Sequence, residues 1–134
     1  MQLIQAQSIG FCFGVRRAID MAEGILKERG SLYILGELIH NASVIRRLEA
    51  LGAVTVNSIE EVPTGETVLI RSHGVPPKVI KDCAARSLNV KNATCPFVEK
   101  IHSIVSEQYS AGRTILIYGK DNHPECIGIN GCCE

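Results

Sequence analysis

The sequence contains no tryptophan, and aromatic residues make up only 4% of its 134 positions. A packed core must therefore rest on aliphatic side chains. Lys and Arg together number 14, as do Asp and Glu, so the formal net charge is zero. Such neutrality argues against a broad surface for nucleic acid or acidic lipid, and any anionic ligand must be held by a local site.

Several familiar signals are also absent. No apolar run approaches the roughly 20 residues of a membrane-spanning helix, and the N-terminus lacks the basic stretch and apolar run of a signal peptide. We therefore expect a cytoplasmic protein that does not enter a membrane. In a reducing compartment the six cysteines indicate metal binding or catalysis rather than a disulfide framework. No C-x-x-C, P-loop or G-x-G-x-x-G pattern occurs, so zinc ribbons and the usual phosphate loops are not supported.

What the chain does contain is an alternation of short extended segments and helical stripes. Strands are expected at residues 3–6, 32–35, 54–56, 67–70, 88–91 and 114–118, and helices over about 15–29, 41–51, 77–87 and 96–110. A single helical turn is expected at 58–62, and no packed element from residue 128 onward. The repetition predicts an α/β fold with a mainly parallel sheet covered by helices.

Reactive side chains fall where an expected strand ends and a helix begins. Because parallel strands point the same way, ligands bind beyond their carboxyl ends. Separate loops would thus deliver two thiols, three imidazoles and a carboxylate to one side of the fold. These side chains belong to Cys12, His40, His73, Cys95 and His123, with Glu125 two residues after His123.

The imidazoles of His40, His73 and His123 each precede a residue suited to starting a helix. Helix N-termini favour anions. Imidazoles add N–H donors, and because their pKa is about 6.5, a bound anion can favour their protonated form. We expect the three together to bind a phosphate or diphosphate, although any one alone would more often be a capping or loop residue. His102 instead lies on an apolar helical stripe with Val105, and is expected to be a satisfied packing residue.

The thiols of Cys12 and Cys95 lie in loops beside Gly and Pro residues. Helix N-termini would stabilise thiolates there, and thiolates are ligands for soft metals. Two distant cysteines fit an iron–sulfur cluster held between loops, but clusters take three or four protein ligands. The remaining cysteines are expected to be core or small apolar residues: Cys83, Cys126, Cys132 and Cys133.

Glu125 has two opposed influences acting on it. A closed pocket would raise its pKa and make the carboxyl group a proton donor. A helix N-terminus would favour the carboxylate instead. The sequence leaves both open, and a first-turn glutamate that stabilises its helix is the simpler interpretation.

At these residues the chain closely resembles the IspH/LytB family of isoprenoid biosynthesis, the hydroxymethylbutenyl diphosphate reductases. The matching segments follow the family's order and spacing along the whole chain, and together they are highly specific. They are Gly10-Phe11-Cys12-Phe13-Gly14-Val15 with Arg17-Ala18-Ile19, Glu37-Leu38-Ile39-His40-Asn41, Ser72-His73-Gly74-Val75, Ala93-Thr94-Cys95-Pro96 and His123-Pro124-Glu125.

The resemblance implies a reductase that removes the allylic hydroxyl of (E)-4-hydroxy-3-methylbut-2-enyl diphosphate, giving isopentenyl and dimethylallyl diphosphates. A 4Fe–4S cluster would be held by Cys12 and Cys95, with a third cysteine from beyond residue 134. The diphosphate would be bound by His40, His73 and His123. Glu125 would help deliver the proton that lets the hydroxyl leave as water. Electrons would come from an external donor such as ferredoxin or flavodoxin.

Members of that family are roughly double this length and form three α/β lobes around a central cluster. The resemblance therefore implies that residues 1–95 form the first lobe, with the N-terminal strand and the Cys12 loop. Residues 96–134 would begin the second lobe. We expect this portion alone to be inactive, and the parent protein to be a monomer that binds no nucleic acid.

Two functions of other classes remain open. A zinc or other divalent-metal phosphohydrolase could use His40, His73, His123 and Glu125 as ligands, and would release phosphate without containing sulfide. A non-catalytic phosphate-binding or scaffold domain would need neither the thiol of Cys12 nor that of Cys95.

Overall fold

A computed structural model describes residues 2–7 and 9–133 and contains one four-stranded sheet. Every pair of neighbouring strands is parallel, in the order β2-β1-β3-β4. The predicted α/β fold with a parallel sheet is therefore confirmed. The strands are β1 (Leu32–Leu35), β2 (Ala53–Val56), β3 (Thr67–Ile70) and β4 (Asn89–Asn92).

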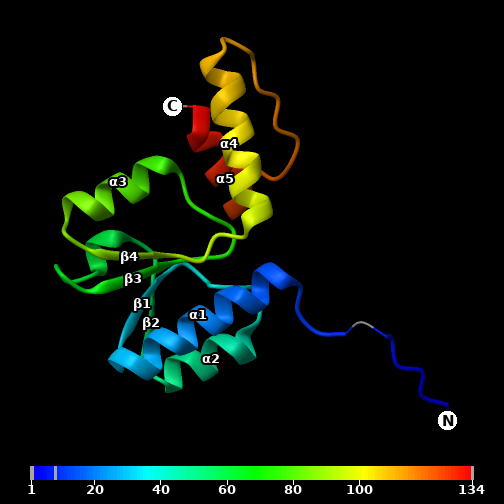
Figure 1. Ribbon diagram of the computed structural model, residues 1–134, viewed down its shortest axis with the longest axis vertical. Helices are drawn as coiled ribbons and strands as arrows, with labels where there is room; N and C mark the ends of the chain where they lie inside the picture. Colours follow the sequence, from blue (N-terminus) through cyan, green and yellow to red (C-terminus); the bar gives the residue numbers. More distant parts are fainter. Residues whose placement is uncertain (1, 8, 134) are drawn as a thin grey trace.

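Helices cover both faces of this sheet (Figure 1). The long helix α1 (Phe13–Arg29) and α2 (Ala42–Ala50) lie on one face, and α3 (Pro77–Ala85) lies on the other. The expected turn forms a 3-10 helix, η1 (Ile59–Glu61), which joins β2 to β3. Among the described residues, no helix combines the length and apolarity needed to cross a bilayer.

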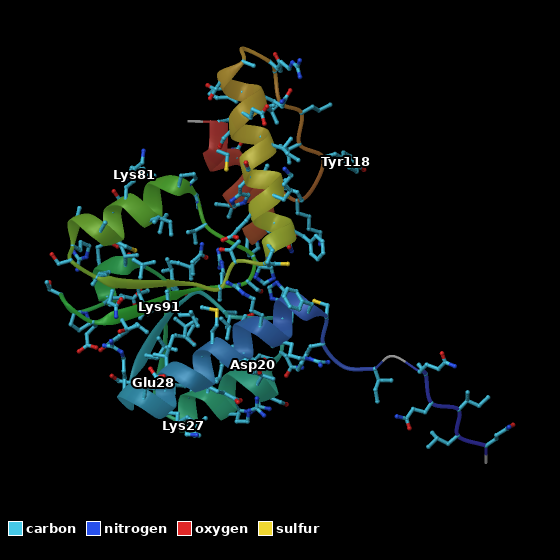
Figure 2. All side chains as sticks on the ribbon, viewed as in Figure 1. Asp20, Lys27, Glu28, Lys81, Lys91 and Tyr118 are labelled. Carbon is cyan, nitrogen blue, oxygen red and sulfur yellow. The ribbon has the colours of Figure 1, made fainter. Side chains whose placement is uncertain are left out.

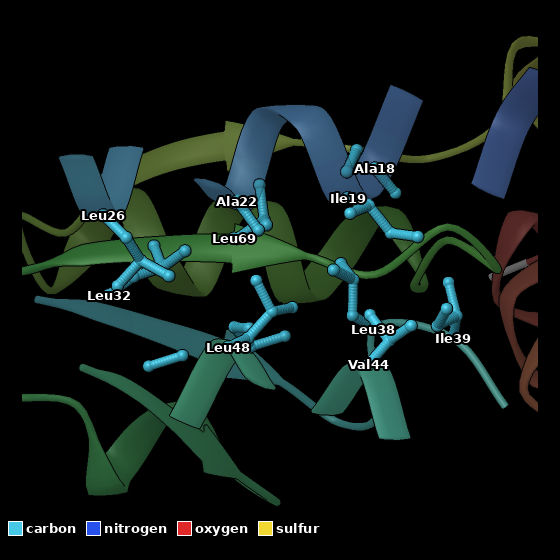
Figure 3. Packing of buried hydrophobic residues seen from close by; sticks show 13 residues of the cluster. Ala18, Ile19, Ala22, Leu26, Leu32, Leu38, Ile39, Val44, Leu48 and Leu69 are labelled. Carbon is cyan, nitrogen blue, oxygen red and sulfur yellow. The ribbon is translucent and has the colours of Figure 1, made fainter. Parts of the chain in front are cut away.

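Alternate residues of the strands pack into two separate hydrophobic cores on opposite faces of the sheet, as the two-residue period of a strand requires. Ile34 and Leu69 face α1 and α2, where Leu26 and Leu48 pack against them (Figure 3). Val68 faces the other way, into the cluster beneath α3. Because β1 and β3 are covered on both sides, they read as continuous apolar runs.

The strand order creates a switch point between β1 and β3. From β1 the chain proceeds outward to β2, whereas from β3 it proceeds to β4 on the opposite side. The loops at the carboxyl ends of the two central strands therefore diverge at this point, which is the usual ligand site in open α/β sheets. His40 and His73 lie in these two loops.

The remainder of the chain forms a helical unit beside the sheet (Figure 1). It consists of α4 (Pro96–Ser110), α5 (Pro124–Asn130) and a 3-10 turn, η2 (Gly131–Cys133). The expectation that the tail lacks a packed element is wrong, because α5 and η2 pack against α4. The η2 turn also lies against the start of α3, where a Cβ at Gly131 would clash with Pro76.

Two expected strands, at residues 3–6 and 114–118, do not form. Residues 2–7 extend away from the domain, and Leu3 is 87% exposed (Figure 1). Tyr118 likewise projects into solvent (Figure 2). Both segments have an apolar, strand-like pattern, but neither pairs with any of the four described strands, and a strand requires a hydrogen-bonded partner. Consequently Cys12 and His123 precede helices without following strands.

Candidate functional site

The side chains of His40, His73 and His123 lie together near this switch point. The ring centroids of His40 and His73 are 4.5 Å apart. His123 lies 6.1 Å from His40 and 6.0 Å from His73, measured between the same points. The prediction that separate loops bring the three imidazoles together is confirmed, although His123 arrives from the start of α5 rather than from a strand end.

Local hydrogen bonds fix how two of these rings present their nitrogens. Nδ1 of His40 donates to the Glu37 carboxylate at 3.3 Å, because a carboxylate can only accept. His123 is the N-cap of α5, and its Nδ1 accepts from the backbone N–H of Glu125 at 3.3 Å. The neutral His123 ring therefore carries its proton on Nε2, which remains able to donate. Nδ1 of His73 is buried without a partner among the described residues.

A path of hydrogen bonds joins the loops that carry these side chains. The buried hydroxyl of Ser72 donates to the carbonyl of Leu38 at 3.0 Å, which links the loops after β3 and β1. The backbone N–H of Cys95 donates to the carbonyl of Ser72 at 2.9 Å, which adds the loop after β4. The imidazole loops and a thiol loop are therefore one connected framework. Sequence reasoning missed Ser72, whose only signal is its place beside His73.

The two thiols at Cys12 and Cys95 are brought to the same side of the molecule, as predicted. Each residue is the N-cap of a helix, Cys12 of α1 and Cys95 of α4. A Cβ at Gly14 would lie 2.6 Å from the sulfur of Cys95, so this sulfur lies against the turn that Cys12 begins. Arg17 on α1 secures the arrangement by donating to the carbonyl of Thr94 at 3.0 Å.

The electrostatic environment of His73 suits an anionic ligand. Burial lowers its pKa, and the neighbouring His40 imidazole lowers it further. The Glu125 carboxylate opposes these effects, while Arg71 and His123 add smaller lowering contributions. An anion placed among these rings would favour the charged imidazole and reverse the direction of the shift.

Arg71 supplies fixed positive charge that sequence reasoning missed. Its guanidinium lies over Gly36, where a Cβ would come 2.3 Å from Nη1. Gly36 has φ of +72°, so both its backbone and the space beside it favour glycine. Burial lowers the pKa of Arg71 and the Glu37 carboxylate opposes this, but an arginine remains protonated in proteins. Its place at the end of β3, two residues before His73, is the only signal in the sequence.

The other predicted positions are placed as follows. Cys83 is a fully buried residue of α3, as expected, and burial raises the pKa of its thiol. Cys132 is also buried, and its thiol donates to the carbonyl of Gly128 at 3.4 Å. His102 packs against Gly74 and Gly128, so its packing role is confirmed. The expectation that it is satisfied is wrong, because its Nε2 has no partner among the described residues.

No three His, Cys, Asp or Glu side chains within residues 2–7 and 9–133 form a group that could hold a metal ion. The zinc centre of the phosphohydrolase alternative is therefore not formed by the imidazole cluster and Glu125. A surface hollow of about 400 Å³ borders His40 and Asn41 and extends along the start of α2, but neither His73 nor His123 lines it.

The chain is similar to known proteins along almost its whole length. Residues 3–134 match the family described as LytB protein. The sequence is 45% identical to the 4-hydroxy-3-methylbut-2-enyl diphosphate reductase of Clostridioides difficile, over 100% of this chain and 48% of the relative. It is 48% identical to the reductase of the same name from Clostridium perfringens, over 98% of this chain and 48% of the relative. The chain thus spans about half the length of the curated relatives it matches.

Two solved structures of reductases are also similar to this chain. The E-1-hydroxy-2-methyl-but-2-enyl-4-diphosphate reductase of Plasmodium falciparum matches with a TM-score of 0.91 and 32% identity, over 94% of this chain and 40% of that one. An (E)-4-hydroxy-3-methyl-but-2-enyl diphosphate reductase, described as the terminal enzyme of the non-mevalonate pathway, matches with a TM-score of 0.83 and 43% identity. That match covers 97% of this chain and 46% of the solved one.

Proposed function

The chain belongs to the LytB protein family, and we propose that it forms about half of a 4-hydroxy-3-methylbut-2-enyl diphosphate reductase. The reaction removes the allylic hydroxyl of the substrate as water and yields isopentenyl and dimethylallyl diphosphates. One observation carries the proposal: three imidazoles meet within 4.5 to 6.1 Å of one another, on a framework that also holds two cysteines at helix N-cap positions. The first group suits a diphosphate, and the second suits an iron–sulfur cluster.

The 4Fe–4S cluster that the family implies fits the two thiols. Gly14 leaves open the space into which the sulfur of Cys95 projects, and a side chain there would fill it. Cys12 and Cys95 both occupy the N-cap position of a helix. We propose that they supply two ligands and that the remaining half of the protein supplies a third cysteine. When bound, the cluster supplies electrons and a Lewis-acidic iron.

The residues of this chain then bind and orient the substrate. His40, His73 and His123 donate to the diphosphate, and Arg71 adds charge behind them. His123 is already suited to this role, because its Nδ1 is occupied and its Nε2 carries the proton. Charge-assisted bonds of this kind are stronger than neutral ones.

Glu125 supplies the proton that the departing hydroxyl takes with it as water. Its side chain is partly buried at the first turn of α5. The pKa of His73 is lowered mainly by burial, and the Glu125 carboxylate lies close enough to oppose that lowering. A general acid must lie within hydrogen-bond reach of its target. Glu125 meets this condition if the diphosphate is bound by the imidazoles beside it.

Other features of the whole protein are part of the same proposal. Residues 1–95 form a first lobe and residues 96–134 begin a second. The parent protein works in the cytoplasm as a monomer and receives electrons from a ferredoxin or flavodoxin. It binds no nucleic acid.

The parent protein prepared without oxygen tests this function. We expect it to contain iron and sulfide and to consume the diphosphate substrate in the presence of a reduced dye. Cys95→Ser should lose cluster and activity together, whereas the control Cys83→Ala, at a buried position of α3, should keep both. A fully loaded and fully active Cys95→Ser variant would refute the proposal. Zinc without sulfide, together with phosphate release, would support the hydrolase instead.

A further inference from the structure

His102 on α4 lies between the loop that carries His73 and the helix that carries Glu125. A Cβ at Gly74 would lie 3.0 Å from Cε1 of His102, and a Cβ at Gly128 would lie 3.1 Å from both Cε1 and Nε2. The ring is thus in close contact with backbone from two elements. Gly128 follows Glu125 by about one helical turn, so both lie on the same side of α5.

The polar end of this ring is not satisfied by the described residues. Nε2 of His102 is buried without a hydrogen-bond partner, and so is Nδ1 of His73. A buried polar atom without a partner costs about 1–3 kcal/mol, and folded proteins leave few of them. Both nitrogens therefore favour a polar partner from a neighbouring side chain.

The carboxylate of Glu125 lies on the side of α5 that Gly128 turns toward His102, and its charge acts on both rings. It raises the pKa of His73 and of His102, against the lowering effect of burial. Glu99 raises the pKa of His102 more strongly. However, the Glu99 carboxylate already accepts from the side-chain amide of Asn92 at 2.9 Å on the exposed side of α4. Glu125 is therefore the better partner for the buried nitrogen.

We propose that His102 is a positioning residue for Glu125, whose carboxyl group accepts a hydrogen bond from Nε2–H of His102 after a change of the Glu125 rotamer. The inference rests on the proposed function for the role of Glu125 and deepens it. The bond occupies one carboxyl oxygen and leaves the other, with its proton, directed at the substrate. When that proton passes to the departing hydroxyl, the same N–H stabilises the carboxylate that remains.

Two substitutions in the parent protein separate this role from simple packing. His102→Phe keeps a planar ring between the glycines but removes both nitrogens, and His102→Gln replaces the ring with an amide that can still donate. We expect His102→Phe to lower kcat about 10- to 100-fold, with KM and the Kd for inorganic pyrophosphate changed less than twofold. His102→Gln should retain markedly more activity. The control Ser103→Ala, at the exposed neighbouring position, should behave as the original protein.

The opposite pattern, an active Phe variant and an inactive Gln variant, would show that the ring acts by shape alone and would overturn the proposal. An equal loss of pyrophosphate binding in both variants would overturn it too. A second readout does not depend on catalysis. In protein with 15N-labelled histidine and bound pyrophosphate, the Nε2–H proton of His102 should exchange slowly with water, and Glu125→Ala should abolish this protection. An unprotected proton, or one unaffected by Glu125→Ala, would contradict the hydrogen bond even if the parent protein proves not to be a reductase.

Discussion

The sulfur of Cys95 rests directly on the backbone of Gly14, where a Cβ would lie only 2.6 Å away. This contact brings the N-cap of α4 beside the first turn of α1, which Cys12 caps. Gly14 is buried and helical, so it is required here for space rather than for an unusual backbone angle. The position of the Cys95 thiol therefore depends on Gly14, which has no side chain and follows Cys12 by two residues.

Gly14→Ala should displace the Cys95 thiol and reduce the iron and sulfide bound by anaerobically prepared parent protein to less than half. Gly24→Ala is a matched control in the same helix, since a Cβ at Gly24 meets nothing within 4 Å. It should leave cluster content unchanged and raise stability by about 0.5–1 kcal/mol, the usual gain in a helix interior. Normal iron content in Gly14→Ala would contradict the steric role of this glycine.

Arg17 joins α1 to the loop before α4 by donating to the carbonyls of Thr94 and Asn92, at 3.0 and 3.3 Å. Hydrogen bonds from a charged group contribute about 1.5–3 kcal/mol each when well made, and less where water competes. Arg17→Ala should therefore lower the free energy of unfolding by about 1–3 kcal/mol and also reduce cluster content. Chemical denaturation measures the first effect. Arg16→Ala, which removes an exposed neighbouring arginine, should change neither property; equal effects of the two substitutions would contradict the prediction.

Asn41 couples helix capping to the position of His40. Its side chain accepts from the backbone N–H of Val44 at 3.1 Å and begins α2. Asn41→Ala should lower stability by about 0.5–2 kcal/mol and weaken pyrophosphate binding measured by calorimetry, because the His40 backbone loses its anchor. Asn41→Ser keeps a capping oxygen and should restore both properties. If Asn41→Ala leaves pyrophosphate binding unchanged, the helix cap does not position His40 for binding.

The imidazole cluster should make stability depend on pH. Burial lowers the folded-state pKa of His73 below its unfolded value of about 6.5. The unfolded chain then takes up a proton at higher pH than the folded protein, so the free energy of unfolding falls as pH drops through and below about 6.5. His73→Asn should show a smaller loss of stability between about pH 7.5 and 5.5. Saturating pyrophosphate should also reduce the loss, because it favours the charged ring. A variant that loses as much stability as the original protein would contradict this assignment.

Local sequence signals were sufficient to predict a strand where the alternation of strands and helices also provides its neighbouring strands. The strand at 67–70 is buried at every position, and its predicted bounds match β3. Residues 114–118 carry an equally good pattern but form no strand, because propensity cannot supply a hydrogen-bonded neighbour. Strand formation is decided by tertiary context, which no window of the sequence contains.

The same limit applies to the site. His40, His73 and His123 could be predicted because each stands beside a helix-start signal in its own loop. Ser72 could not, since its value lies in a bond to Leu38, 34 positions earlier. The contact of His102 with Gly74 and Gly128 also depends on how two helices and a loop pack. Residues that act on the chemistry leave local signals, whereas residues that hold the loops together do not.

The central claim is that Cys12 and Cys95 share one site. Cluster-free parent protein treated with a short reagent that bridges two thiols, followed by peptide mass spectrometry, tests it most directly. We predict a cross-link between the peptides containing Cys12 and Cys95, and none between Cys12 and the buried Cys83. If Cys12 and Cys95 are each modified singly and never bridged, the thiols do not lie together and the account is wrong.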